Sequence, residues 1–272
     1  GPMAGKKIQR LIVTHHHPDH VGLAGWFQKE YKVSLWMTRT AWLTARMLRL
    51  DEQEVPPPET IEFWTQAGMC SDIMEERKSG KPFNFADAVS ALPLGFRRIV
   101  DNEEIEIGNR IWKVRVGNGH APEHATLWSN VDDIVIAGDQ IISSISPNLG
   151  VYATEPNANP VKEWIDTCHK LSAFASDKHL TLSGHKLPFT GLKFRLKQMV
   201  ENHELAFNRL VNFLEKPHTA EECFNTLFGK SIQNSEYGLA LVEAVAHVNY
   251  LYLEGTVSRI LDKNGAFRYQ AL

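Results

Sequence analysis

The segment from Thr14 to His20 constrains this chain more than any other, because it holds four of the twelve histidines within seven residues. It follows the apolar, β-rich run LIV at residues 11–13, which is too short for a helix by itself, so we expect a buried strand that ends just before His15. Pro18 disfavours a helix before it. The histidine cluster is therefore expected in a loop at the end of a strand.

Three further strand-like runs also end at a side chain that can bind a metal. His120 follows WKVRVGNG, Asp139 follows IVIAG, and His185 follows LTLSG. Because a sheet presents such loops along one edge, we expect these residues and the histidine cluster to converge. Imidazole and carboxylate groups suit zinc, and also iron, manganese, cobalt or nickel. The three cysteines are scattered and do not indicate a thiolate site.

Spacing within the histidine cluster predicts how the ligands divide. Alternate residues of an extended segment point the same way, so His15 and His17 are expected to share one metal while His16 points elsewhere. Asp19 and His20 lie beyond the proline and are expected to face a second metal. A lone HxH motif is as often ordinary packing, but HxHxDH followed by three more strand-end ligands favours function.

The rest of the pattern predicts an α/β fold. Helical segments at about residues 40–90 interrupt the strands and are interpreted as an inserted cap. Hairpins are expected at 105–116 and 125–137, followed by a helix at 159–174 and a short strand at 179–182.

Beyond residue 190 the pattern becomes mostly helical. Helices are predicted at 191–214, after a Thr219 capping box, and at 237–254, with a hairpin at 257–269. Three helices and a small ribbon predict a winged-helix-like domain. We therefore predict a catalytic domain at 1–190 and a C-terminal domain at 191–272.

The ligand pattern resembles that of the metallo-β-lactamase superfamily, and the similarity covers nearly the whole chain. Seven positions carry it: His15, His17, Asp19, His20, His120, Asp139 and His185. The resemblance implies an αβ/βα sandwich with a dinuclear site of two divalent ions. It implies one ion on His15, His17 and His120. The other is expected on Asp19, His20 and His185, with Asp139 bridging both.

Within the superfamily, the pattern is more similar to glyoxalase II, the N-acyl-homoserine lactonases and the tRNA 3′-processing nucleases than to the true β-lactamases. The chain departs from the family at its beginning. Relatives usually have several strands before HxHxDH, one of them with Asp-Thr-Gly, whereas one predicted strand precedes His15. We expect either a chain that begins late or a truncated sheet. A catalytically impaired scaffold is therefore one alternative function.

The implied mechanism is hydrolysis by a bridging hydroxide that two metal ions make reactive at neutral pH. Asp19 and Asp139 are the residues assigned to catalysis, because both carboxylates contact the metals and Asp19 can orient the hydroxide. No GxSxG motif indicates a serine nucleophile. His16 is expected to lie behind the ligands or on the surface rather than to bind a metal, and His124 is expected to have a structural role. The isolated His203 and His247 are interpreted as ordinary.

The substrate is inferred from charge. Residues 186–272 hold ten Lys or Arg and nine Asp or Glu, so the tail lacks the excess of basic residues typical of nucleic-acid modules. We therefore favour an ester, thioester or lactone bond of a small molecule, with RNA phosphodiester cleavage as the alternative. The tail is expected to pack on the catalytic domain or to form a homodimer contact.

Composition excludes several other classes of protein. Hydrophobic residues make up 43%, charged residues 22% and the formal net charge is −3, which excludes a disordered or strongly basic chain. No apolar run approaches the roughly 18 residues that span a bilayer. We expect a soluble cytoplasmic protein with no membrane partner, since the cysteines form no disulfide pattern.

Overall fold

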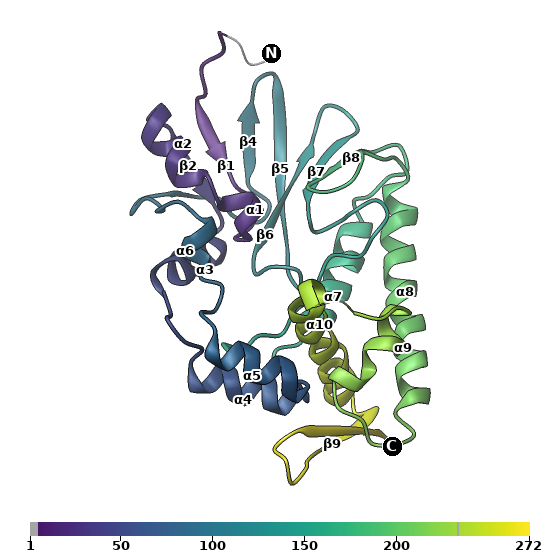
Figure 1. The fold of residues 1–272 in the computed structure, drawn as a ribbon. Helices are drawn as coiled ribbons and strands as arrows, with labels where there is room; N and C mark the ends of the chain where they lie inside the picture. Colours follow the sequence, from purple (N-terminus) through teal and green to yellow (C-terminus); the bar gives the residue numbers. More distant parts are fainter. Residues whose placement is uncertain (1–4, 233) are drawn as a thin grey trace. The chain divides into compact units, whose positions relative to one another are not determined.

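The computed structural model describes residues 5–232 and 234–272, which divide into two compact units (Figure 1). Unit 1 comprises Gly1–Glu52, Phe83–Ile145 and Lys178–Thr190. Unit 2 comprises Gln53–Pro82, Ser146–Asp177 and Gly191–Leu272. The helical segment at about residues 40–90, which the sequence pattern predicts as one inserted cap, is therefore divided between the two units, and its middle part, Gln53–Pro82, belongs to unit 2.

Unit 1 begins with a small parallel sheet of order β1-β2-β3, formed by Arg10–Ile12, Ser34–Met37 and Arg97–Arg98. Its helices are α1 (Pro18–Val21), α2 (Ala24–Tyr31), α3 (Arg39–Leu50) and α6 (Phe85–Ala88). The strand predicted at residues 11–13 is confirmed as β1. The chain turns at Gly22-Leu23, between α1 and α2.

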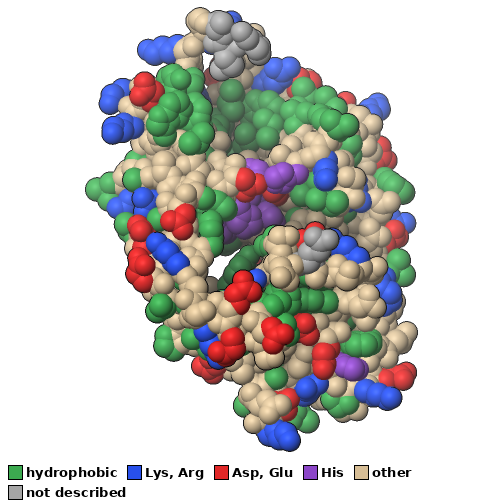
Figure 2. All heavy atoms as spheres, in the orientation of Figure 1, with side chains coloured by type: hydrophobic (Ala, Val, Ile, Leu, Met, Phe, Trp, Pro, Cys, Tyr) green, Lys and Arg blue, Asp and Glu red, His purple; other side chains and the backbone are tan. Residues whose placement is uncertain are grey.

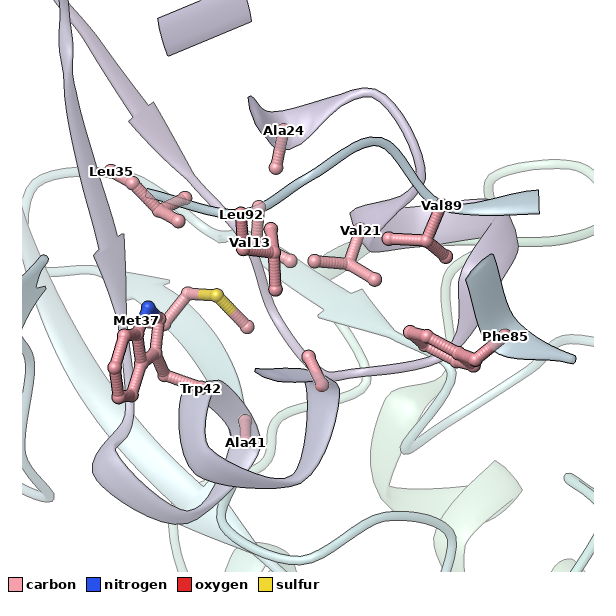
Figure 3. Packing of buried hydrophobic residues seen from close by; sticks show 11 residues of the cluster. Val13, Val21, Ala24, Leu35, Met37, Ala41, Trp42, Phe85, Val89 and Leu92 are labelled. Carbon is pink, nitrogen blue, oxygen red and sulfur yellow. The ribbon is translucent and has the colours of Figure 1, made fainter. Parts of the chain in front are cut away.

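Side chains of β2 alternate between the two faces of this sheet, as a strand requires. Leu35 and Met37 are buried against the helices, in a cluster that includes Val21 of α1, Trp42 of α3 and Phe85 of α6 (Figure 3). Trp36, between them, packs against the other core cluster of unit 1. The three-stranded sheet is thus covered by helices on one face and by a second sheet on the other.

The second sheet has the order β4-β5-β6-β7-β8, and its strands are Glu104–Ile107, Arg110–Gly117, His124–Ser129, Ile134–Gly138 and Leu180–Ser183. Its first four strands pair antiparallel, which confirms both predicted hairpins, whereas β7 and β8 are parallel. Trp112, Val114 and Leu127 bury their side chains toward the first sheet. Because β7 and β8 run the same way, both end at the same edge.

Unit 2 is mainly helical. Its elements are α4 (Pro58–Ala67), α5 (Ser71–Ser79), α7 (Pro160–Ser172), α8 (Leu192–Phe213), η1 (Glu221–Cys223), α9 (Phe224–Phe228), α10 (Asn234–Leu253), β9 (Val257–Leu261) and β10 (Phe267–Ala271). β9 and β10 form the predicted antiparallel ribbon. The Thr219 capping box is present, since the Glu222 amide donates to the Thr219 Oγ1 and the Thr219 amide donates to the Glu222 carboxylate. Within the described ranges, no helix is long and apolar enough to cross a membrane.

Two histidines interpreted as ordinary from the sequence contact each other in the core of unit 2. His203 Nδ1 lies 3.2 Å from His247 Nε2, and both side chains are buried. The Nδ1 of His247 donates to the carbonyl oxygen of Glu243 at 2.8 Å. Burial lowers the pKa of His203 to about 3 and that of His247 to about 4, so the pair is neutral at pH 7. The two residues are 44 positions apart, and no sequence pattern indicated their contact.

Glu243 makes the stability of the protein depend on pH. Burial raises the pKa of its carboxyl to about 7, although the Asn148 amide donates to its Oε2 at 2.7 Å. The unfolded chain ionises Glu243 near its usual pKa, so this group stabilises the fold below that value and the contribution is lost as pH rises through 7. We expect Glu243→Gln to raise the free energy of unfolding by up to a few kcal/mol at pH 8, but not at pH 4.5.

Denaturant titrations at both pH values measure this effect. The exposed Glu204 of α8 offers a matched control, and Glu204→Gln should leave the midpoint unchanged at either pH. If the denaturation midpoint of Glu243→Gln equals that of the unaltered chain at pH 8, ionised Glu243 does not destabilise the fold and this prediction is wrong.

Candidate metal centre

All seven predicted ligands lie at one edge of the unit 1 sheets. His15 and His17 belong to the loop after β1, and Asp19 and His20 lie in the first turn of α1, where Pro18 fits because the first helical amides need no partner. His120 lies in the loop between β5 and β6. Asp139 directly follows β7, and His185 follows β8 by two residues. Figure 2 shows histidine side chains gathered beside acidic ones on one face of the molecule.

The first donor group consists of His15, His17 and His120. His17 Nδ1 lies 3.1 Å from His15 Nε2 and 3.0 Å from His120 Nε2. His15 is fully buried, and the other two side chains are mostly buried. One imidazole proton cannot satisfy two neighbouring nitrogens at once, so this triangle suits a shared cation better than hydrogen bonds.

The second donor group consists of Asp19, His20, Asp139 and His185. The Oδ2 of Asp139 is central to it, at 3.2 Å from His20 Nε2 and 3.1 Å from His185 Nε2. Asp19 Oδ2 lies 3.0 Å from His185 Nε2. Asp139 Oδ2 also lies 3.7 Å from His120 Nε2, so this carboxylate reaches both groups. Asp139 is buried, whereas about half of the Asp19 and His185 side chains is exposed.

The two groups differ in charge. Burial and the neighbouring imidazoles lower the pKa of His17 to about 2 and push the pKa of His15 lower still, so both rings are neutral and keep a lone pair for a metal. Burial lowers the pKa of His20, but its hydrogen bond to Asp139 and the charges of Asp139 and Asp19 outweigh burial and raise it. Burial raises the pKa of Asp139, whereas His20, His120 and His185 lower it overall. Asp139 is therefore ionised at neutral pH.

Each donor group has ligand types and a spacing that could hold a metal ion. Bonds of 2.0–2.1 Å to nitrogen and oxygen ligands correspond to about 3.3–3.4 Å between neighbouring ligand atoms. In each group the donor atoms all lie within 4.8 Å of one another. The Oδ1 of Asp139 is buried and has no hydrogen-bond partner among the described residues, so this oxygen is available to bind a cation.

Gly184 allows Asp139 and His20 to lie close to the end of β8. A Cβ at this position would lie 2.2 Å from Asp139 Oδ1 and 2.6 Å from His20 Cε1. The Gly184 amide donates to the carbonyl oxygen of Gly138 at 2.9 Å, which ties the end of β8 to the end of β7. A residue without a side chain is therefore needed where the two strands deliver their ligands.

His124 contacts two of the proposed ligands, His15 and Asp139. It is fully buried, and its ring stacks on His15 with centroids 4.5 Å apart. The amide of Asp139 donates to its Nε2 at 3.1 Å, so His124 holds the backbone of one ligand and the ring of another. This contact agrees with the structural role expected from the sequence, but only the position of His124 four residues after His120 hinted at it. His16 is mostly buried and its ring lies 4.6 Å from that of His17.

Comparisons with known proteins agree with this architecture. The family model described as metallo-beta-lactamase superfamily matches residues 3–191, and the one described as metallo-beta-lactamase-like, C-terminal domain, matches residues 207–272. The probable metallo-hydrolase YqjP of Bacillus subtilis (strain 168) is 22% identical over 269 residues, which cover 96% of this chain and 80% of that protein.

Two solved structures are similar over almost the whole chain. A beta-lactamase domain protein from Burkholderia ambifaria has a TM-score of 0.88 at 30% identity, with 99% of this chain and 76% of that chain covered. The metallo-beta-lactamase family protein TTHA1429 from Thermus thermophilus has a TM-score of 0.78 at 23% identity, with 97% of this chain and 80% of that chain covered.

An α/β sandwich with two adjacent groups of histidine and aspartate donors at its strand ends is the framework of a metal-dependent hydrolase. The chain belongs to the metallo-β-lactamase superfamily. The predicted fold class and the predicted hydrolase class are thereby confirmed.

Proposed function

We propose that this protein is a dinuclear metal-dependent hydrolase that cleaves an ester, thioester or lactone bond of a small molecule, with water as the nucleophile. The observation that carries the proposal is the meeting of seven histidine and aspartate side chains in two adjacent groups, joined by the Asp139 carboxylate. Zinc is the metal we propose, because imidazole and carboxylate donors at these spacings suit it.

The residues have separate roles in this proposal. His15, His17 and His120 would hold one ion, and Asp19, His20 and His185 the other, with Asp139 shared. When bound, such a pair of ions would supply a water molecule of lowered pKa and polarise the bond under attack. Asp19 remains half-exposed, so its carboxylate can orient the attacking water and take up its proton. Asp139 is ionised and buried, and it keeps the two donor groups together.

Charge favours a small substrate over RNA. Ten basic and nine acidic residues in 186–272 offer no excess of positive charge for a phosphate backbone. We further propose that 1–190 and 191–272 are the catalytic and C-terminal domains, and that the latter, with its helices and two-stranded ribbon, is of winged-helix type. We propose that the C-terminal domain packs on the catalytic domain or forms a homodimer contact. We also propose that the protein is cytoplasmic and has no membrane partner.

A substrate panel with metal analysis tests the proposal. The purified chain should hold close to two transition-metal ions, and it should hydrolyse one class among acyl-thioesters, aryl esters and lactones but leave single-stranded RNA intact. A chelator should abolish turnover, and added Zn²⁺ should restore it. Cleavage of RNA alone would contradict the proposed substrate class. A chain that binds two ions and cleaves none of these bonds would instead be a scaffold.

A further inference from the structure

We infer that Glu123, which no motif singles out, is a positioning residue that ties the loop carrying His120 and His124 to the N-terminus of helix α3. The inference rests on the proposed function, since it concerns how tightly the first donor group binds its ion. Glu123 lies three residues after His120 and directly before His124, between β5 and β6. Its position is therefore coupled to a proposed ligand and to the ring that supports Asp139.

The backbone of Glu123 is in a conformation that side chains rarely adopt. Its φ is +48°, in the left-handed region where glycine fits without cost and a glutamate is strained. Such strain persists only where the surroundings compensate for it, and it is common near functional sites. The contacts of Glu123 should then explain why a glutamate occupies this position.

Three hydrogen bonds hold Glu123 in place. The Thr40 amide donates to its Oε2 at 2.6 Å, and the Thr38 hydroxyl donates to its carbonyl oxygen at 2.7 Å. Its own amide donates to Oδ1 of Asn118 at 2.9 Å. Side chain and backbone are thus fixed from two directions, by the start of α3 and by the start of the loop itself.

Helix α3 depends on this contact for its N-terminal cap. Thr38 is the N-cap residue, yet its side chain makes no capping bond because its hydroxyl is turned to Glu123. The carboxylate of Glu123 accepts from the Thr40 amide instead, and negative charge is favourable at a helix N-terminus. One glutamate therefore caps a helix that lies 83 residues earlier in the chain, and the same contact fixes the loop that carries His120.

Three substitutions at Glu123 separate the effect of its carboxylate contact with Thr40 from the effect of its strained backbone. Glu123→Ala removes the carboxylate and keeps the strained backbone, Glu123→Gly removes both, and Glu123→Gln keeps an oxygen that can accept from Thr40. The probe is Zn²⁺ alone, measured by competition with a chromophoric chelator on the full chain. We expect zinc affinity to fall about 10- to 100-fold in Glu123→Ala, as for other residues that orient ligands, and to stay within about threefold in Glu123→Gln.

Glu123→Gly is the decisive variant. If Glu123 positions the loop, zinc affinity stays at least tenfold weaker in this variant even though the strain is gone. Asn84→Ala is the control for a general loss of stability, because it removes the capping box of α6 in the same unit. It should lower the thermal midpoint of the metal-free protein and leave zinc affinity unchanged.

The outcomes are distinguishable. Wild-type zinc affinity in Glu123→Ala, or its restoration in Glu123→Gly, would overturn this inference and leave the proposed function intact. Failure of the unaltered chain to bind Zn²⁺ would overturn the proposed function and the inference together. A fall in zinc affinity in Asn84→Ala equal to that in Glu123→Ala would show that Glu123 acts only through stability.

Discussion

Replacement of Asp139 by asparagine is expected to lower turnover by about a thousandfold or more and to reduce the metal content from two ions per chain toward one. The carboxylate reaches both donor groups, at 3.1–3.2 Å from His20 and His185 and 3.7 Å from His120. Asparagine keeps the shape but loses the charge that offsets two cations. A loss of several kcal/mol of transition-state stabilisation corresponds to this factor.

Metal analysis and steady-state kinetics on the purified variant measure both effects. Asp166→Asn is the matched control, because Asp166 is an exposed aspartate of α7 in the other unit, where it pairs with Lys162. It should retain two ions and full turnover. If Asp139→Asn also retains two ions and full turnover, Asp139 does not bridge the donor groups, and the proposed dinuclear arrangement is wrong.

The convergence of the seven side chains was predictable because each one follows a strand-like run. Residues at the ends of strands that run in the same direction share a sheet edge whatever their distance in sequence, so the separation of 170 positions between His15 and His185 did not obscure the site. The hairpins and the long helices of the tail were predictable for a similar reason, since their periodicity is local.

The support of the site was not predictable in the same way. Glu123 bonds to Thr40 through tertiary packing, at a spacing that no helix or strand would bring together. The contact of His203 with His247 in unit 2, which is no part of the site, was unpredictable for the same reason. The allocation of residues 53–82 to unit 2 is also a tertiary result. Their helical pattern shows which face is apolar, but it does not show which surface that face covers. The proposed metal ligands could thus be predicted from sequence motifs, whereas the residues that hold the ligands in place could be identified only in the structure.

Gly184→Ala is expected to disrupt the second donor group and to weaken its hold on a metal ion. The added Cβ would lie 2.2 Å from Asp139 Oδ1 and 2.6 Å from His20 Cε1, closer than atoms can approach. Asp139 cannot retreat freely, because its amide donates to the buried His124, and Gly184 is tied to Gly138 by its own amide. The second donor group must therefore open by a sizeable fraction of an ångström.

We expect Gly184→Ala to lose the ion held by Asp19, His20 and His185 and to lower turnover about a hundredfold, since a displacement near 1 Å can cost that much. Gly95→Ala is a close control in the same unit, because a Cβ there meets no atom within 4 Å and its φ is compatible with alanine. It should keep both ions and full turnover. Metal content, measured for both variants, separates the outcomes: two tightly bound ions in Gly184→Ala would mean that the donors are not held where the structure shows them. The lost ion should return at high Zn²⁺ concentration, because the methyl group displaces the ligands without removing any of them.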